Sequence, residues 1–310
     1  MRLIIRFILI IFISLNIHGE SVRFKKQVKL GDSLYKKKIA DMFLGKKKRP
    51  LIKPSSITLL NNYNYCITDQ SNGVAAILNM KGELIRVFKR NRKIALVSPV
   101  SVCTDNKGYI YVSDSFMRSI IKFNDQLKKP EILIFNRDKR ITGITVLNEK
   151  LFCTDTQNHK ILVYNLKGEL TNSFGSRGTG DLEFNFPTHI AVDNEYIYIT
   201  DALNFRIQIL DHKGGFVRKF GRNGRRGGDF SKPKGIAVDS KKRIFVTDVM
   251  FDNVQIFDIN GRFLDTFGVA GSREGEFWMP SGIYINSTNM IYIADTYNNR
   301  LQVFEVIKEN

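Results

Sequence analysis

Six aspartates recur along the chain, each at the end of an apolar run. They are Asp69, Asp114, Asp155, Asp201, Asp248 and Asp295, spaced 45, 41, 46, 47 and 47 residues apart. A carboxylate that ends a strand can accept hydrogen bonds from loop amides, and an Asn three residues later suits a tight turn. The chain has such residues at Asn72, Asn158, Asn204 and Asn298, and cations five residues after the Asp at Lys160, Arg206 and Arg300. Because this set recurs from copy to copy, we predict a structural role and ion pairing with the Asp.

The histidines bear on whether a metal-dependent reaction is expected. A catalytic metal needs several converging ligands from the start of the first strand in each repeat. The aligned positions there are Ser56, Ser101, Gly143, His189, Gly235 and Gly282. One histidine among serines and glycines cannot hold a catalytic metal. The chain also has no nucleophile-elbow motif and no phosphate-binding glycine loop. We therefore expect no catalytic residue, no metal and no cofactor, and His189 is the one residue whose chemistry stays open.

Only three cysteines are present, Cys66, Cys103 and Cys153, and each lies in a strand-like apolar stretch. Their odd number and apolar surroundings argue against a disulfide framework. We predict small, buried free thiols.

Around each aspartate the same four short strands recur. An apolar strand such as 235–239 is followed by the strand that ends in Asp, by a third strand such as 206–210, and by a fourth such as 216–221. Four strands repeated every 41 to 47 residues are typical of a propeller blade. A single blade cannot bury both faces, so every copy needs neighbours, and a closed ring supplies them. We predict an all-β, six-bladed β-propeller of four-stranded antiparallel blades.

The two ends of the chain indicate how this ring closes. The last copy stops after its third strand, LQVFEV, and residues 39–45 (IADMFLG) match the fourth-strand segment 263–268 (FLDTFG). We predict that an N-terminal strand, residues 39–45, completes the last blade. The propeller domain is accordingly expected to span residues 39–310.

The repeat resembles the NHL repeat family from Ile39 to Val306, most fully in the last three blades. The matching motifs are Phe-x-x-Pro, then Gly-Ile-Ala-Val-Asp, then Asp-x-x-Asn-x-Arg. The aromatic residues three before a proline should plug the joints between blades, with leucines in the same place in earlier copies: Phe184, Phe230, Phe277, Leu51 and Leu96. Trp278 is expected to pack at a joint, with a ligand-stacking platform as the alternative. The resemblance implies a binding platform, although some similar six-bladed propellers are metal-dependent hydrolases or lyases.

The first nineteen residues have the three parts of a secretory signal peptide. Arg2 and Arg6 precede an apolar run from Phe7 to Ile13, and Gly19 offers a small residue for cleavage. The apolar run is shorter than the ~20 residues that span a bilayer. We expect an exported protein of the periplasm or cell envelope, with an uncleaved N-terminal anchor as the alternative. A basic N-terminal segment, residues 20–38, follows.

The net charge of +18 favours anionic partners. Twelve Lys or Arg against three acids occupy residues 20–53 alone. Other basic clusters fall in the loops between blades, which should emerge on one face. The predicted anion- or partner-binding residues are Lys46, Lys47, Lys48, Arg49, Lys89, Arg90, Arg92, Lys93, Arg137, Arg140, Arg222, Arg225, Arg226, Lys232 and Lys234. We expect them to make about four adjacent blade joints basic, while acids balance the loops around Arg177 and Arg273.

The sequence thus predicts a non-catalytic binding or scaffold propeller that docks an acidic protein, polymer or lipid surface through a basic loop face. A purely structural envelope component that assembles through its rim is one alternative. A nucleic-acid-binding propeller, as for some eukaryotic NHL proteins, is disfavoured because the protein is expected to be exported. Aromatic residues are also not interleaved with the basic clusters, as stacking on single strands requires.

Overall fold

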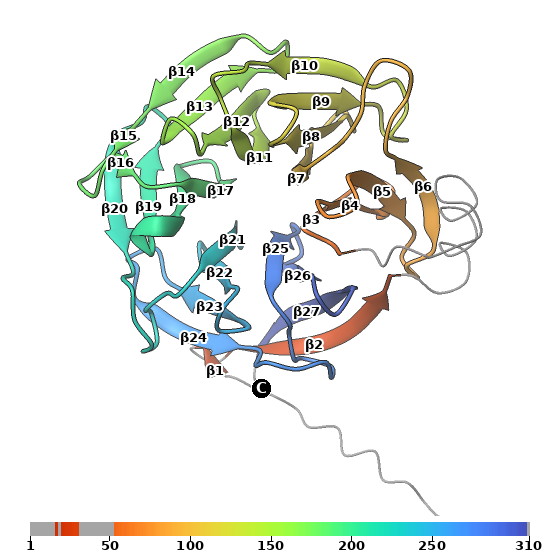
Figure 1. Cartoon of the computed structure of the whole chain (residues 1–310). Coiled ribbons are helices and arrows are strands. Elements are labelled where there is room, and N and C mark those ends of the chain that lie inside the picture. Colours follow the sequence, from red (N-terminus) through yellow and green to blue (C-terminus); the bar gives the residue numbers. More distant parts are fainter. Residues whose placement is uncertain (1–15, 18–19, 31–52, 309–310) are drawn as a thin grey trace, which may run out of the picture.

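The computed structural model describes residues 16–17, 20–30 and 53–308, and they form a ring of six sheets around a central channel (Figure 1). Each of the six sheets is antiparallel. Five are built from four strands that follow one another along the chain, and the sixth joins C-terminal strands to strands from the N-terminal part of the chain. The predicted fold class is confirmed. Within the described residues, no helix is both long and apolar enough to cross a membrane.

The strands succeed one another blade by blade around the ring. Blades 1 to 3 comprise β3 (Ser56–Leu59), β4 (Tyr65–Asp69), β5 (Val74–Leu78) and β6 (Leu84–Phe88); β7 (Pro99–Thr104), β8 (Ile110–Asp114), β9 (Ser119–Phe123) and β10 (Glu131–Phe135); β11 (Ile141–Leu147), β12 (Lys150–Asp155), β13 (Lys160–Asn165) and β14 (Leu170–Phe174). Blades 4 to 6 comprise β17 (Pro187–Val192), β18 (Tyr196–Asp201), β19 (Arg206–Asp211) and β20 (Phe216–Phe220); β21 (Pro233–Val238), β22 (Ile244–Asp248), β23 (Asn253–Phe257) and β24 (Phe263–Phe267); β25 (Pro280–Ile285), β26 (Met290–Asp295), β27 (Arg300–Lys308), β2 (Glu20–Lys29) and β1 (Asn16–Ile17). A short parallel pair, β15 (Ser176–Arg177) and β16 (Glu183–Phe184), and one 3-10 turn, η1 (Ala202–Asn204), complete the elements.

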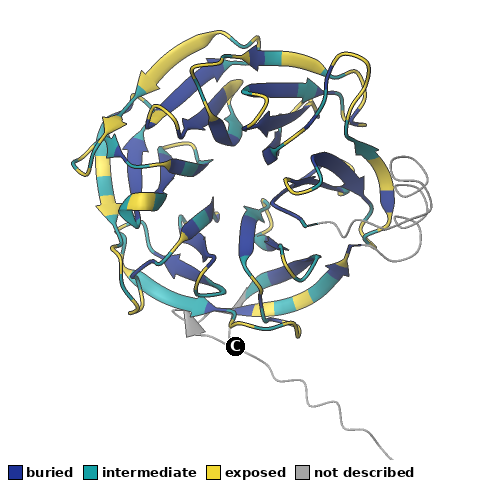
Figure 2. Ribbon diagram, viewed as in Figure 1, coloured by how far each residue is buried: buried dark blue, intermediate teal, exposed yellow. Residues whose placement is uncertain are grey.

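Burial follows the position of a strand within its blade. Every residue of the second strand β4 is buried, whereas the outermost strand β14 is exposed along nearly its whole length. Figure 2 shows the same gradient around the ring, from buried inner strands to exposed outer ones. Apart from the hydroxyl residue and the aspartate at their ends, the second strands are largely apolar, because both of their faces pack against neighbouring blades, and their sequences therefore do not alternate.

The apolar core lies between blades, in six clusters that each join two adjacent sheets. Phe184, Phe230 and Phe277 are fully buried in three of these clusters, and Leu96 is 3% exposed in another. The predicted plugs are therefore confirmed at these four positions. Leu51 lies outside the described residues.

The ring closes through an N-terminal strand, but a different one from that predicted. β2 pairs with β27 over a long register that runs from Glu20 opposite Lys308 to Lys29 opposite Arg300. Because β2 occupies the fourth-strand position of the last blade, the assignment of that role to residues 39–45 was wrong, and residues 20–29 belong to the propeller domain. Residues 39–45 themselves lie outside the described part of the chain.

The apolar residues in and directly after β2 explain why this segment forms the fourth strand of the last blade. Val22 and Phe24 pack into the cluster shared with blade 5, whereas Val28 and Leu30 pack into the cluster shared with blade 1. A register shift between Phe24 and Lys26 separates the two pairs. An extra residue at such a bulge moves the following side chains to the other face of the strand. The single strand can therefore contact both neighbouring blades.

The pairing registers place the loops at the two ends of the channel. In blade 1, Asp69 at the end of β4 lies beside Val74 at the start of β5, and Phe88 at the end of β6 pairs with Ala75. The aspartate turns and the loops between blades therefore emerge together, as predicted. We call this end of the ring the loop face.

Candidate functional site

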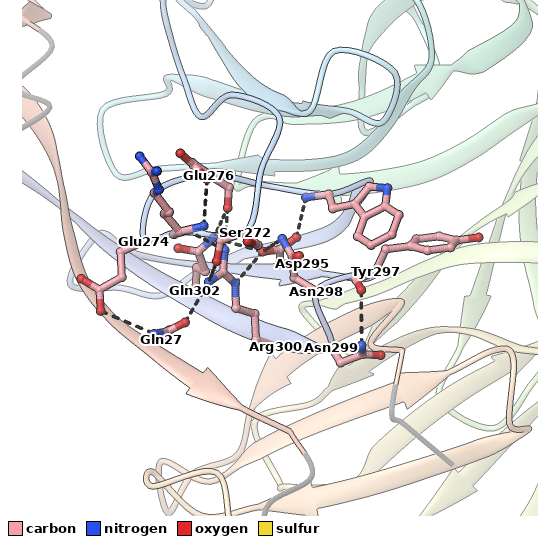
Figure 3. A network of polar contacts seen from close by, with 12 residues as sticks. Gln27, Ser272, Glu274, Glu276, Asp295, Tyr297, Asn298, Asn299, Arg300 and Gln302 are labelled. Atoms are coloured by element: carbon pink, nitrogen blue, oxygen red, sulfur yellow. Dashed lines mark hydrogen bonds and ion pairs between the residues drawn. The ribbon is translucent and has the colours of Figure 1, made fainter. Parts of the chain in front are cut away.

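The strand-end aspartates are buried and saturated with hydrogen bonds. Asp295 is fully buried and accepts from the backbone N–H of Trp278 (2.8 Å), from the Asn298 amide (2.9 Å) and from Nε of Arg300 (2.7 Å). Figure 3 shows these contacts converging on the carboxylate. Asp201 has the same set of partners in blade 4. Such contacts leave no free carboxylate for chemistry and agree with the predicted structural role.

Two buried arginines fasten the glycine-rich loops to the ring. The guanidinium of Arg300 donates to the carbonyls of Ser272, Arg273 and Glu276 and also to the side chain of Gln27 on β2 (Figure 3). One side chain thus joins the strand-end aspartate, the loop before blade 6 and the closing strand.

Not every copy carries this clamp. Arg206 makes the equivalent contacts to residues 179–183. Lys160, at the same position in blade 3, is exposed, and no ion pair joins it to Asp155 in the described structure, so its predicted pairing was wrong. In blade 5 the position is Asn253, whose Oδ1 is buried without a partner. The loop before that blade therefore has no arginine clamp.

The predicted basic residues divide into three groups. Lys46, Lys47, Lys48 and Arg49 lie outside the described residues. Those that lie in loops at the loop face are Lys89, Arg90, Arg92, Lys93, Arg137, Arg140, Arg222, Arg225, Arg226 and Lys232. Of these, Arg222 pairs with Asp229 at 2.8 Å, and the salt bridges of the described chain include none of the others. Lys234 is not in a loop but on the innermost strand β21.

The basic loops are not all adjacent, contrary to the sequence prediction. The loops before blades 2 and 3 are neighbours, but the loop before blade 4 carries Asp181 and Glu183 and separates them from the basic loop 222–232. The loop before blade 6, with Glu274 and Glu276, bounds 222–232 on the other side. The described part of the loop face therefore has two separate cationic sectors.

Trp278 is exposed rather than packed in a joint, so the prediction of a packing role was wrong. Its side chain is 54% exposed and lies against Tyr297, with ring centroids 5.6 Å apart, and the ammonium of Lys53 lies 4.4 Å from the Tyr297 ring centroid. Other large apolar side chains are exposed on the same face: Val97, Phe116, Met117, Phe186, Leu203 and Met250. The sequence signal was available, since Phe116, Leu203, Met250 and Tyr297 each stand two residues after a strand-end aspartate.

The central channel holds a cavity of about 270 Å³ lined by the six innermost strands. Ser56, Ser101, Gly143, His189, Gly235 and Gly282 all line it, which confirms their alignment. His189 is 8% exposed, and neither of its ring nitrogens has a hydrogen-bond partner. Burial, and then the positive charge of Lys234, lower the pKa of His189 to about 3. Within the described residues, no three His, Cys, Asp or Glu side chains are grouped so that they could hold a metal ion.

A ring of hydroxyl groups joins the blades around this channel, and the sequence analysis did not identify it. The residue before the strand-end aspartate donates to a carbonyl of the next blade: Thr68 to Val100, Ser113 to Thr142, Thr154 to Thr188, Thr200 to Lys234 and Thr247 to Ser281. The sequence pattern that could have predicted these contacts is the Thr-Asp or Ser-Asp pair at the end of the second strand in five of the six copies.

Comparisons with known proteins agree with this architecture. Residues 131–208 match a family model described as a 6-bladed beta-propeller, and residues 277–304 match the NHL repeat. No curated protein matches the chain.

Several solved structures share the fold at low sequence identity. Virginiamycin B lyase from Staphylococcus aureus has 13% identity and a TM-score of 0.62, over 93% of this chain and 100% of that one. A gluconolactonase from Xanthomonas campestris has 12% identity and a TM-score of 0.64, over 90% and 91%. An auxiliary nutrient binding protein from Bacteroides thetaiotaomicron has 14% identity and a TM-score of 0.63, over 82% and 69%. The six-sheet topology therefore shows that the chain is a six-bladed β-propeller, and one of its repeats, residues 277–304, matches the NHL repeat.

Proposed function

We propose that this protein is a non-catalytic binding propeller of the cell envelope that docks an acidic partner through its loop face. The observation that carries the proposal is the set of exposed cations there that form no salt bridge within the described residues, including Arg90, Arg92, Arg225 and Arg226, of which only Arg226 has a nearby acid, Asp229. A salt bridge within the described residues would have neutralised each of these charges. In its absence, these charges attract an anionic surface.

The apolar side chains of the same face support a protein partner over a polymer or lipid surface. Phe116, Met250 and Trp278 are each more than half exposed, and all three stand in loops or turns of the loop face. Aromatic residues and methionine are enriched in protein interfaces, where they occupy the core of the contact while charges occupy the rim. An acidic protein with apolar anchors complements this arrangement.

The comparisons leave the activity open, because the structures that share the fold include a lyase, a gluconolactonase and a nutrient binding protein at 12–14% identity. The exposed cations, and not the fold, are the basis of the proposal. Export to the envelope rests on the N-terminal sequence pattern, residues 1–19.

A pull-down from native envelope at low salt, eluted by a salt step, tests the proposal. Reversal of Arg90, Arg92, Arg225 and Arg226 to Glu should abolish capture, since electrostatic attraction between exposed charges is screened by salt. A matched control reverses four exposed lysines in the turns of the opposite face: Lys81, Lys128, Lys167 and Lys213. Equal capture by both variants would refute the proposal and favour a structural component that assembles through its rim.

A further inference from the structure

The innermost strands of neighbouring blades approach one another closely at the six aligned positions that begin with Ser56. Ser56 Oγ accepts from the backbone N–H of Val102 in the next blade at 3.2 Å, and Ser101 Oγ accepts from Ile144 N–H at 3.4 Å. A Cβ atom added to Gly235 would lie only 2.3 Å from a carbonyl oxygen of the following blade. Added Cβ atoms at the remaining glycines, Gly143 and Gly282, would each lie 2.7 Å from the next blade. Five of the six positions are thus small, and the joint between blades 4 and 5 alone has a large polar side chain.

That side chain is His189, and it lacks the contacts that a structural histidine makes. A neutral imidazole has one N–H donor and one acceptor nitrogen, and both are buried without a partner. The preceding Thr188 has a buried hydroxyl that is also unpartnered. Buried polar groups in proteins are nearly always hydrogen-bonded, so unpaired groups beside a cavity call for a partner inside it, either water or a ligand. By contrast, His159 and His212 each have a hydrogen bond to the backbone.

A cation stands next to this pair. Thr200 is paired with His189 in the sheet of blade 4, and its Oγ1 donates to the carbonyl of Lys234 on β21 at 2.9 Å. Lys234 therefore adjoins His189 across the blade joint, and its charge lowers the pKa of the imidazole. Burial, together with the nearby charge of Lys232, lowers the pKa of Lys234 to about 8. The salt bridges of the described chain do not include Lys234.

The chemistry of these three groups indicates the ligand. Lys234 is a single positive charge without a counter-charge, while the imidazole and the hydroxyl offer neutral hydrogen-bond donors. One cation with two neutral donors matches a monoanion with two oxygens. The cavity of about 270 Å³ suits a small molecule: His189 and Gly235 line it, and Thr188 and Lys234 directly precede them in their strands.

We propose that the channel binds the carboxylate of a small organic acid between Lys234, His189 and Thr188. This site goes beyond the proposed function, because it lies in the channel and takes a small molecule, whereas the acidic partner docks on the exposed loops. Reversal of the loop arginines should leave it intact, and the two proposals can fail separately.

Calorimetric titration of the full chain with acetate, lactate and benzoate, and with inorganic phosphate as a comparator, tests the site. The imidazole resonances of His189 are followed by NMR in parallel. At least one carboxylate should bind saturably and shift the His189 resonances. Affinity for the carboxylate should fall at least tenfold in Lys234→Met and in His189→Ser. The second variant has the residue that blades 1 and 2 carry at the aligned positions Ser56 and Ser101. Lys232→Met removes a nearby exposed charge and should change affinity less than twofold.

Three outcomes would overturn the inference. The first is the absence of saturable binding by all three acids, which would mean that water alone occupies the cavity. The second is binding that Lys234→Met and Lys232→Met weaken equally. The third is binding of phosphate but of no carboxylate, which would assign the site to a different anion. Circular dichroism of each variant, with Lys234→Gln as a second neutral replacement, separates loss of binding from loss of folding.

Discussion

The hydroxyl of Thr200 donates a hydrogen bond to the backbone carbonyl of Lys234 at 2.9 Å, and this contact joins blade 4 to blade 5. Four other joints have the same contact, from the residue before the strand-end aspartate to the next blade. At the joint between blades 6 and 1, where the ring closes, the residue before the strand-end aspartate is Ala294. Here the hydroxyl of Thr296 donates instead to the carbonyl of Pro54 at 2.7 Å. The blades are therefore joined by polar contacts near the channel as well as by apolar clusters farther out.

Replacement of Thr247 by Val should destabilise the ring. The Thr247 hydroxyl donates to the Ser281 carbonyl and accepts from the Gly235 N–H, and the side chain is fully buried. An isosteric Val leaves both backbone groups unpaired, at a cost of about 1–3 kcal/mol in the free energy of unfolding. Urea denaturation measures this change. Thr179→Val, at an exposed site, is the control and should cost less than about 0.5 kcal/mol; equal losses in the two variants would contradict the role of the hydroxyl ring.

Deletion of residues 1–30 should destabilise the protein far more than deletion of residues 1–19. Only the longer deletion removes β2 and with it the buried side chains of Val22, Val28 and Leu30. Each of these contributes about 1.5–3 kcal/mol through burial. At roughly 2–4 °C per kcal/mol, Tm should fall by more than about 10 °C, as measured by calorimetry. Similar melting temperatures for the two deletions would show that β2 does not close the ring.

Arg300→Lys should loosen the loop before blade 6. A lysine cannot reproduce the forked contacts of the guanidinium to the carbonyls of Ser272, Arg273 and Glu276. We expect a loss of at least about 2 kcal/mol and faster proteolytic cleavage within residues 271–276. Lys160→Ala changes the same repeat position in blade 3, where the side chain is exposed, and should have little effect on either measurement. Unchanged cleavage in Arg300→Lys would contradict the clamp.

Acid should destabilise the protein through His189. The folded state holds the pKa of His189 at about 3, below the ordinary value of 6.5, so below pH 6.5 the unfolded state binds the proton and the folded state does not. The free energy of unfolding should fall as pH is lowered from 6.5 towards 3, by up to about 1.4 kcal/mol per pH unit from this group. Urea titrations at pH 7 and pH 5 measure the change. His189→Ser should show a shallower fall, and the same pH dependence in both proteins would assign the effect to other groups.

The three thiols should be unreactive in the folded protein. Cys66, Cys103 and Cys153 are free and buried, as predicted from the sequence, and burial raises the pKa of each thiol. Because the thiolate is the reactive form, a thiol reagent should label them at neutral pH only after unfolding. Mass spectrometry with and without urea measures the labelling. Rapid labelling of native protein at any of the three would contradict their burial.

The local pattern of the sequence determined the number of blades, the place of the Phe plugs and the alignment of Ser56 to Gly282 around the channel. These features are repeated, and each rests on the succession of apolar and polar residues within a single copy. The structural role of Asp201 and Asp295, whose carboxylates are filled with hydrogen bonds from neighbouring groups, could be predicted for the same reason. A residue that recurs in every blade has the same neighbours in every blade.

Only the tertiary structure decided what depends on contacts between distant segments. The closing strand could not be found by its likeness to 263–268, because the choice of β2 rests on a bulge that turns Val22 and Val28 towards different blades. The exposure of Trp278 and the separation of the basic loops depend on how neighbouring blades pack and on their order around the ring. His189 and Lys234 are 45 residues apart in the sequence, and only the packing of blade 4 against blade 5 brings their strands together at the channel, where burial and nearby positive charge set the chemistry of both.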